Sequence, residues 1–192
     1  MQNFHVPHSR LYRSAVLVMV VLPFLALVLA IALLWNRYVF SSDILLLFVF
    51  LLLSGLGITV GYHRLLTHAS FQTYAPIKAF FLMCGCMAFE GSPLTWAATH
   101  IYHHAHSDEE GDPHSPIHGF WHAHMGWLFR PHHENPAVIA PHLLKDPVVM
   151  FVDRTAGIWM LVAFIVPALL GGWTGFLWGG LVRIFLTTHI TW

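Results

Sequence analysis

Histidine is the residue type in this sequence with the clearest chemical potential. The chain has 16 histidines, and most of them lie between His63 and His142. Clustered imidazoles repel one another when protonated, whereas a bound metal ion keeps them neutral. The clustering therefore indicates metal binding, and neutral imidazole suits Zn, Cu, Fe and Ni.

The first compact group is His63 and His68, directly after an apolar run. Residues five apart are separated by about 140° on an ideal α-helix, so these two do not share a helix face. If both bind metal, either the helix ends between them or they serve different ions.

The second compact group is His100, His103 and His104. His100 and His104 are four residues apart, so on a helix one imidazole lies above the other on a single face. His103 lies about 100° around the helix from His104, which turns it toward a neighbouring ion. A zinc-protease site is excluded because the glutamate that accompanies such a pair is absent.

The two groups together suggest two metal ions, since five histidines exceed the four ligands of an ordinary zinc site. Neither group contains cysteine, which argues against copper(I) and iron–sulfur centres. An all-nitrogen dinuclear iron site would suit O₂ activation, but ligand type alone does not identify iron.

An acidic loop follows the second group. Asp108 and Asp112 are candidates to hold imidazole N–H groups from behind, as carboxylates commonly do at metal sites, whereas Glu109 and Glu110 are expected in solvent. Eight other histidines are expected outside the metal site. His118, His122 and His124 could act as ligands, but packing among interfacial aromatic residues is favoured for them. Surface positions are expected for His5, His8, His132, His133 and His142.

The elements that position these groups must belong to a membrane protein. The 192 residues are 57% hydrophobic and 9% charged, against about 25% charged in soluble domains. This composition excludes an ordinary soluble domain and a disordered chain. The net charge is zero, so no basic field attracts nucleic acid. Cys84 and Cys86 cannot form a disulfide framework.

Four apolar stretches are predicted to span the bilayer, at residues 14–35, 44–60, 157–170 and 175–192. The first is too long for a signal peptide. The stretch 77–89 is shorter, so it is expected to be interfacial, re-entrant or packed on protein. Arg10 and Arg13 precede the first span, which places the N-terminus and the histidine-rich region 61–155 in the cytoplasm.

The predicted fold class is an all-α integral membrane protein. Two transmembrane helical hairpins, the second turning at Gly171–Gly172, would carry a cytoplasmic histidine-rich cap between them. The whole chain, 1–192, reads as a single membrane domain, because no repeat or low-complexity linker divides it.

These residues resemble the membrane-bound fatty acid desaturases, specifically the acyl-CoA Δ9 (stearoyl-CoA) desaturase-like branch in a short bacterial form. The resemblance covers roughly residues 40–192 and rests on four segments. They are His63-Arg64-Leu65-Leu66-Thr67-His68, His100-Ile101-Tyr102-His103-His104, Asp112-Pro113-His114-Ser115-Pro116 and the run from Gly119 to Trp127.

The resemblance implies an O₂-dependent oxidoreductase that introduces a cis double bond, at Δ9, into a saturated acyl chain. Two iron ions would be held in part by the five histidines of the two groups. The substrate would be an acyl-CoA or an acyl-lipid, and a ferredoxin or a b-type cytochrome would supply electrons. The protein would lie in a bacterial inner membrane.

The resemblance also assigns residues to an apolar tunnel for the acyl chain. Trp96, Thr191 and Trp192 would line its bend, and Leu51 and Gly55 would lie near its closed end. The family has a third histidine box and an Asn-x-x-x-His motif, both beyond Trp192. We therefore expect a C-terminally truncated desaturase with an incomplete ligand set for its two irons.

Two alternatives remain open from the sequence. A related di-iron hydroxylase would use the same residues and insert oxygen. A membrane metal-binding or transport protein would use them without O₂ chemistry, although a transporter would place its ligands near the bilayer midplane and not just outside the apolar runs.

Overall fold

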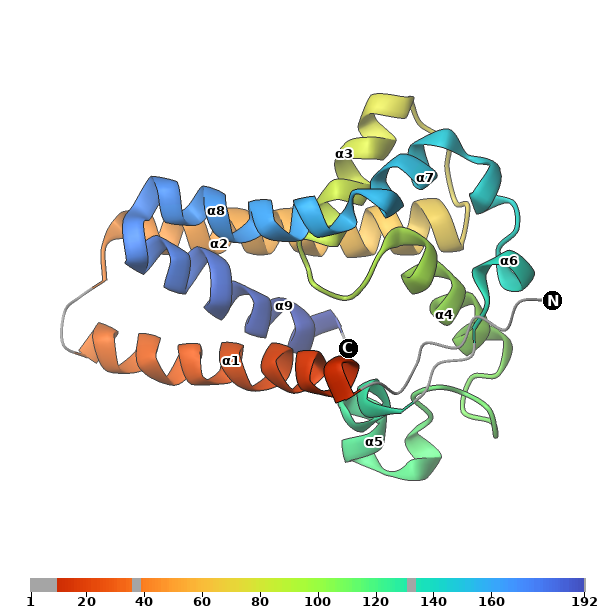
Figure 1. The fold of residues 1–192 in the computed structure, drawn as a ribbon, viewed down its shortest axis with the longest axis horizontal. Helices are drawn as coiled ribbons and strands as arrows, with labels where there is room; N and C mark the ends of the chain where they lie inside the picture. The colour runs from red at the N-terminus through yellow and green to blue at the C-terminus, as the bar shows by residue number, and fades with distance from the viewer. Residues whose placement is uncertain (1–9, 36–38, 131–133, 192) are drawn as a thin grey trace.

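The protein is described by a computed structural model that covers residues 10–35, 39–130 and 134–191. Helices joined by turns and loops make up these residues, and no strand occurs among them. The long helices form an elongated bundle, and the shorter helices form a cap at one end of it (Figure 1). The all-α class predicted from the sequence is confirmed for the described residues.

Three stretches of the described chain are helical, long and apolar enough to cross a membrane: Arg10–Leu34, Ser41–Thr67 and Ala156–Thr191. The first is helix α1, Arg10–Trp35. The second joins α2, Ser41–Leu56, to a π-helical segment η1, Gly57–Thr67. This helix continues beyond Val60, where the apolar run ends, and so carries His63 out of the bundle.

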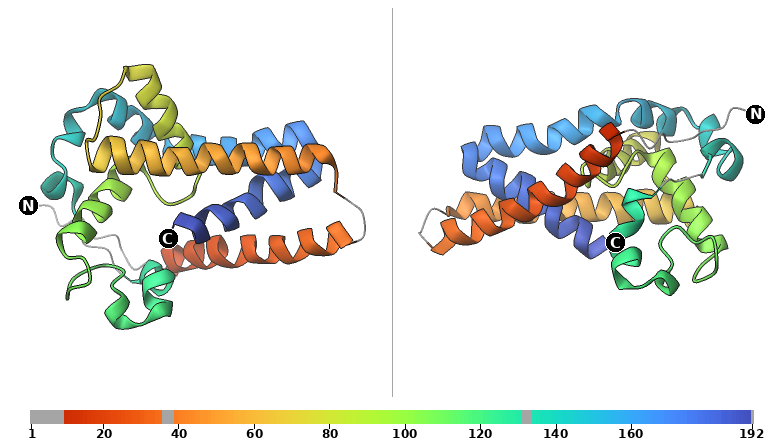
Figure 2. Two further views of the ribbon diagram at one scale, coloured as in Figure 1. Left: turned by 180° about the vertical axis from the view of Figure 1, so that it is seen from behind. Right: turned by 60° about the horizontal axis from the view of Figure 1, so that its bottom comes forward.

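The third stretch doubles back on itself. It comprises α8 (Ala156–Gly175), the π-helical η5 (Phe176–Val182) and α9 (Arg183–Thr191). Gly172 has φ 63° and ψ −147°, a conformation that glycine adopts far more readily than other residues. The reversal lies at the predicted Gly171–Gly172 turn, and Figures 1 and 2 show the η5–α9 arm returning alongside α8.

The returning arm lies between α1 and α2. Helix α1 packs mainly on η5 and α9, and α2 packs on η5, α8 and α9 (Figure 2). Ala26 and Ala30 of α1 and Trp178 and Val182 of η5 are buried in the core of this bundle. The outer face of α1 exposes apolar side chains such as Leu25, which is 55% exposed. An apolar outer face suits contact with lipid.

The cap is assembled around η1, the end of the second long helix. Its helices are α3 (Ala75–Cys86), α4 (Pro93–Ala105), α5 (Phe120–His124), α6 (Pro136–Ile139) and α7 (Pro147–Arg154), with short turns η2 (Pro116–His118), η3 (Gly126–Phe129) and η4 (Leu143–Lys145).

Close packing joins η1 to the rest of the cap. Gly57 lies so near α3 that a Cβ there would be 2.1 Å from the Gly85 nitrogen. Tyr62, Leu82 and Val149 are fully buried in the shared core. For the stretch 77–89 the sequence left three placements open; its residues up to Cys86 lie in α3, which packs on η1, α2 and α7.

Candidate metal centre

The π-helical geometry of η1 brings His63 and His68 together. The backbone N–H of His68 donates to the His63 carbonyl over 3.0 Å, which is the i to i+5 hydrogen bond of a π-helix. This wider turn places residues five apart on nearly the same face, and the two Nε2 atoms are 3.1 Å apart. The helix η1 ends at Thr67 and His68 is its C-cap, so the helix does end between the two histidines, which was one of the two options offered by ideal α-helix geometry.

Helix α4 supplies the opposing pair. It begins at a side-chain cap in which Ser92 accepts a hydrogen bond from the Thr95 backbone N–H, and Pro93 occupies the first turn, where its missing N–H is harmless. The α-helical repeat aligns His100 and His104, whose Nε2 atoms are 3.0 Å apart. This pair lies on one face, as the four-residue spacing predicts.

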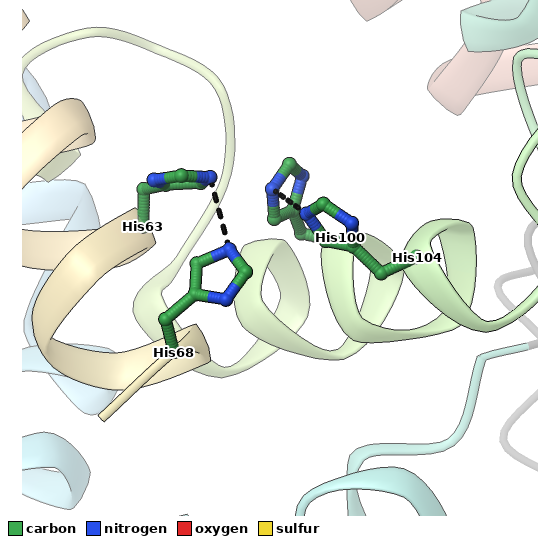
Figure 3. Close-up of side chains that lie close together, drawn as sticks. All are labelled: His63, His68, His100 and His104. Atoms are coloured by element: carbon green, nitrogen blue, oxygen red, sulfur yellow. Dashed lines mark hydrogen bonds between the residues drawn. The ribbon is translucent and has the colours of Figure 1, made fainter. Parts of the chain in front are cut away.

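The two pairs face each other across the gap between η1 and α4 (Figure 3). The ring centres of His63 and His100 are 4.8 Å apart, and those of His68 and His104 are 4.9 Å apart. One nitrogen from each of the four imidazoles lies within 4.8 Å of the others. Four convergent nitrogen donors of this kind fit a borderline divalent metal such as iron or zinc.

Electrostatics keeps the α4 pair neutral. Burial, followed by the neighbouring imidazoles, lowers the pKa of His100 to about 3. Burial and the charges of His68 and His103 also lower the pKa of His104. Metal ligation requires neutral imidazole, so these side chains are in the ligand form at neutral pH.

His103 lies beside the four-histidine group and not within it. Its Nδ1 is 2.8 Å from Oδ1 of Asp112, and its ring stacks on His114 at 4.0 Å. His103, Asp112 and His114 form a second cluster of possible ligands. With Nδ1–H donated to the carboxylate, the Nε2 of His103 is left available to a metal.

Asp112 is well placed to orient His103. Its buried carboxylate accepts backbone hydrogen bonds from Asp108 and His114, each 3.1 Å long. Burial alone would raise the pKa of Asp112, but the hydrogen bond from His103 and these backbone bonds outweigh it and lower the pKa. Asp108 contributes its backbone N–H to this arrangement.

An apolar cavity of about 720 Å³ extends from the metal centre toward α1. His100 and His114 lie at its polar end, and Val18 and Leu22 of α1 lie among its apolar residues. Trp96 and Thr191, two residues assigned to the tunnel bend, line the cavity, whereas Leu51 and Gly55 of α2 are outside its lining. Trp192 lies outside the described residues.

Glu90 is a cavity residue that sequence reasoning missed. Its carboxylate accepts a hydrogen bond from Nε1 of Trp96 at 3.1 Å and another from the Thr191 hydroxyl. Trp96 in turn stacks on His100, with ring centres 4.5 Å apart. A lone acidic residue directly after the apolar stretch 77–89 was the available signal.

The remaining histidines are distributed around the loops of the cap. His122 is buried, with its ring 5.1 Å from that of His118. His124 packs on the aromatic ring of Phe120 and lies 2.9 Å from Nδ1 of His189 on α9. His142 is exposed. His5, His8, His132 and His133 lie outside the described residues.

The fold and the site define a helical membrane protein with a histidine-rich candidate metal centre beside an apolar cavity. The chain belongs to the fatty acid desaturase family, whose sequence profile matches residues 42–192. The prediction of a membrane protein and the family inferred from the histidine groups are thereby confirmed.

Individual relatives agree with this assignment. The chain is 36% identical over 190 residues to a hex-5-enoyl-[acyl-carrier protein] acetylenase of Moorena producens, covering 88% of this chain and 59% of that protein. It is 38% identical over 148 residues to an sn-1 stearoyl-lipid 9-desaturase of Anabaena variabilis, and the match covers 76% of this chain and 54% of that protein. The Delta-9 acyl-lipid desaturase 1 of Arabidopsis thaliana is 36% identical over 141 residues, and the match covers 71% of this chain and 46% of that protein. The chain thus spans about half the length of these curated relatives.

Proposed function

We propose that this chain carries part of the catalytic apparatus of a fatty acyl desaturase. The supporting observation is that His100 belongs to both features the reaction needs. It is one of the four convergent imidazoles, and it lines the apolar cavity. A metal held there would meet a hydrocarbon chain bound in the cavity.

Two iron ions are the proposed cofactor, with O₂ as the oxidant. His63, His68, His100 and His104 would hold one iron, and His103, oriented by Asp112, would contribute to the other. Bound iron would activate O₂, which is the oxidant that removes two hydrogens from an unactivated CH₂–CH₂ unit. The protein residues would keep the imidazoles neutral, and the apolar cavity would hold the acyl chain beside His100.

The proposed substrate is a saturated acyl chain carried on CoA or on a lipid. The apolar walls of the cavity would bind its methylene groups, and Trp96, Glu90 and Thr191 would shape the bend that favours a cis product. A double bond at Δ9 and roles for Leu51, Gly55 and Trp192 rest on the family resemblance. A ferredoxin or a b-type cytochrome would supply the electrons.

The proposed topology has four membrane crossings, because the stretch Ala156–Thr191 reverses at Gly172. Arg10 and Arg13 at the start of α1 favour a cytoplasmic N-terminus. The cap, which lies at the same end of α1 (Figure 1), would then face the cytoplasm of a bacterium whose inner membrane holds the bundle.

Product analysis tests this proposal. Because the chain spans about half the length of its relatives, it would be fused to the part of the Anabaena variabilis relative that it does not match. The fusion would be expressed in a bacterium without an acyl desaturase of its own, and the fatty acids would be analysed by gas chromatography and mass spectrometry. We expect a new cis-monoenoic acid that His100→Ala abolishes and His142→Ala retains. A hydroxy acid would indicate the hydroxylase alternative. Stable zinc binding with no acyl product would favour the metal-binding or transport alternative.

A further inference from the structure

The connector between α3 and α4, residues 87–91, is partly buried and has an unusual backbone. Phe89 has φ 67° and Gly91 has φ 113°, both in the left-handed region. A non-glycine residue is unfavourable there and persists only where its surroundings hold it in place. Glu90, between these two residues, is the one whose carboxylate lines the cavity.

Arg183 of α9 holds the first end of this connector. Its Nη1 donates to the Met87 carbonyl and, over 3.1 Å, to the Ser54 hydroxyl, while Nε donates to the Gly179 carbonyl of its own arm. The side chain is fully buried, and Nη2 has no hydrogen-bond partner among the described residues. Removing a charged guanidinium from water costs free energy. Packing alone therefore does not account for an arginine at this position, whereas its hydrogen bonds to the connector do.

Tyr62 of η1 holds the other end. Its ring is fully buried, and its hydroxyl lies 3.3 Å from the Gly91 carbonyl and 3.1 Å from Sγ of Cys86. Side chains from two different long helices therefore form hydrogen bonds to the two ends of this short connector. Glu90 lies between these two ends, and its carboxylate accepts hydrogen bonds from Trp96 and Thr191.

We infer that Arg183 and Tyr62 are positioning residues that fix Glu90, and through it Trp96, in the cavity. Trp96 stacks on His100, so this arrangement sets the separation between the cavity bend and the histidine centre. Where the cavity binds an acyl chain, that separation would select the carbon atoms presented to the metal. This last consequence rests on the proposed function, whereas the positioning of Glu90 does not.

The positioning can be measured without enzymatic activity. The full chain would be reconstituted in lipid vesicles and treated with dicyclohexylcarbodiimide, an apolar reagent that adds to carboxyl groups in apolar surroundings, and labelling of Glu90 would be followed by mass spectrometry. The variants are Tyr62→Phe, which removes one oxygen, and Arg183→Met. Thr188→Val is the matched control, because Thr188 is buried on α9 and bonds only to carbonyls of its own helix.

Hydrogen bonds from Trp96 and Thr191 shield both Glu90 oxygens, so release of the connector should speed labelling. We expect an increase of about fivefold, the population change that follows loss of one buried hydrogen bond, in Tyr62→Phe and Arg183→Met. The Thr188→Val rate should equal that of the parent chain. Unchanged labelling of Glu90 in Tyr62→Phe would overturn the inference. If Arg183→Met does not fold, the result for Tyr62→Phe alone decides the test.

A second readout separates this inference from the proposed function. If the parent chain makes one monoenoic isomer, Tyr62→Phe should produce a mixture of double-bond positions, whereas Thr188→Val should not. A single unshifted isomer together with faster Glu90 labelling would refute the link to specificity. If no chain makes an alkene but labelling responds as expected, the proposed function fails and the positioning of Glu90 stands.

Discussion

At the scale of single residues, His100 belongs both to the four-histidine group and to the lining of the cavity. Its imidazole faces His63 and His104, and its ring also stacks on Trp96. Replacement by alanine removes a donor and leaves the group with three imidazoles. We expect His100→Ala to weaken Co²⁺ binding by at least about 100-fold, beyond the 10–100-fold typical of residues behind the ligands.

The absorption of bound Co²⁺ at visible wavelengths, titrated in detergent, measures this loss. His142→Ala is the matched control, since that histidine is exposed and lies outside both clusters of possible ligands. Equal affinity of His100→Ala and the parent chain would show that the four-histidine group is not the metal site.

Asp112 allows a separate test of the residues behind the ligands. Asp112→Asn keeps the shape of the side chain but removes the negative charge that accepts the His103 N–H. We expect metal affinity to fall by about 10-fold to 100-fold, with no large change in folding. Glu109→Gln, which alters an exposed acid of the same loop, should leave affinity unchanged in the same titration. An equal effect of both substitutions would assign the loss to loop charge.

At the scale of elements, the π-helical η1 decides whether His63 and His68 can cooperate. Deleting Thr67 would leave them four residues apart, which an α-helix aligns. Inserting alanine after Thr67 would leave them six apart, which aligns on neither an α-helix nor a π-helix. We expect the deletion to retain Co²⁺ affinity within about tenfold and the insertion to lose it. Retention by the insertion variant would contradict a site that depends on this spacing.

The junction of α3 with α7 supports a stability prediction. Asp146 caps α7 by accepting the Val148 and Val149 N–H groups, and it pairs with Lys78 of α3 at 2.7 Å. Burial would raise its pKa, but the hydrogen bond from Lys78 and the backbone bonds lower it. A carboxylate with a depressed pKa contributes stability above its unfolded value of about 3.9, and this contribution is lost as the pH falls through that range.

Asp146→Ala should therefore lower the free energy of unfolding near pH 7 by about 1–2 kcal/mol, mostly through the lost helix cap. The difference from the parent chain should shrink as the pH falls from about 5 to 3. Thermal unfolding followed by circular dichroism across this range is the measurement. Asp146→Asn should restore most of the loss, because asparagine also caps helices, and a constant difference at every pH would contradict the assignment.

The sequence predicted the positions of the helices more accurately than it predicted their local backbone geometry. Apolar runs located the long helices, and the α4 pair follows directly from a four-residue spacing. The alignment of His63 with His68 could not be predicted, because it depends on a π-helix that packing on α3 accommodates. Glu90 was missed for a similar reason: its cavity position depends on Arg183 and Tyr62, which lie far away in the chain. Leu51 and Gly55 lie outside the cavity lining, which no local pattern could reveal.

At the scale of the whole molecule, the bundle and the cap depend on each other. The helix that begins as α2 ends as η1, and the cap core forms around it. The η5–α9 arm contributes Arg183 to the connector and Thr191 to the cavity. The site is therefore built from segments spread over the chain, so the membrane helices and the metal centre are expected to fold as one unit.

Metal content per chain tests this view of the assembled site. The described residues place four imidazoles in one group and His103, Asp112 and His114 in another, so a second iron would meet only the second group, in which Asp112 is already engaged by His103. We expect the purified 192-residue chain to hold less than two iron equivalents. A fusion that adds the corresponding C-terminal part of the Anabaena variabilis relative should approach two.

Iron in both purified proteins would be measured by mass spectrometry, with the His100→Ala form of the fusion as the control for nonspecific binding. Two irons in the 192-residue chain would mean that further histidines of this chain, with His114, His118 and His122 as the nearest candidates, complete the second site. The second metal site would then consist of His103, oriented by Asp112, together with these further histidines.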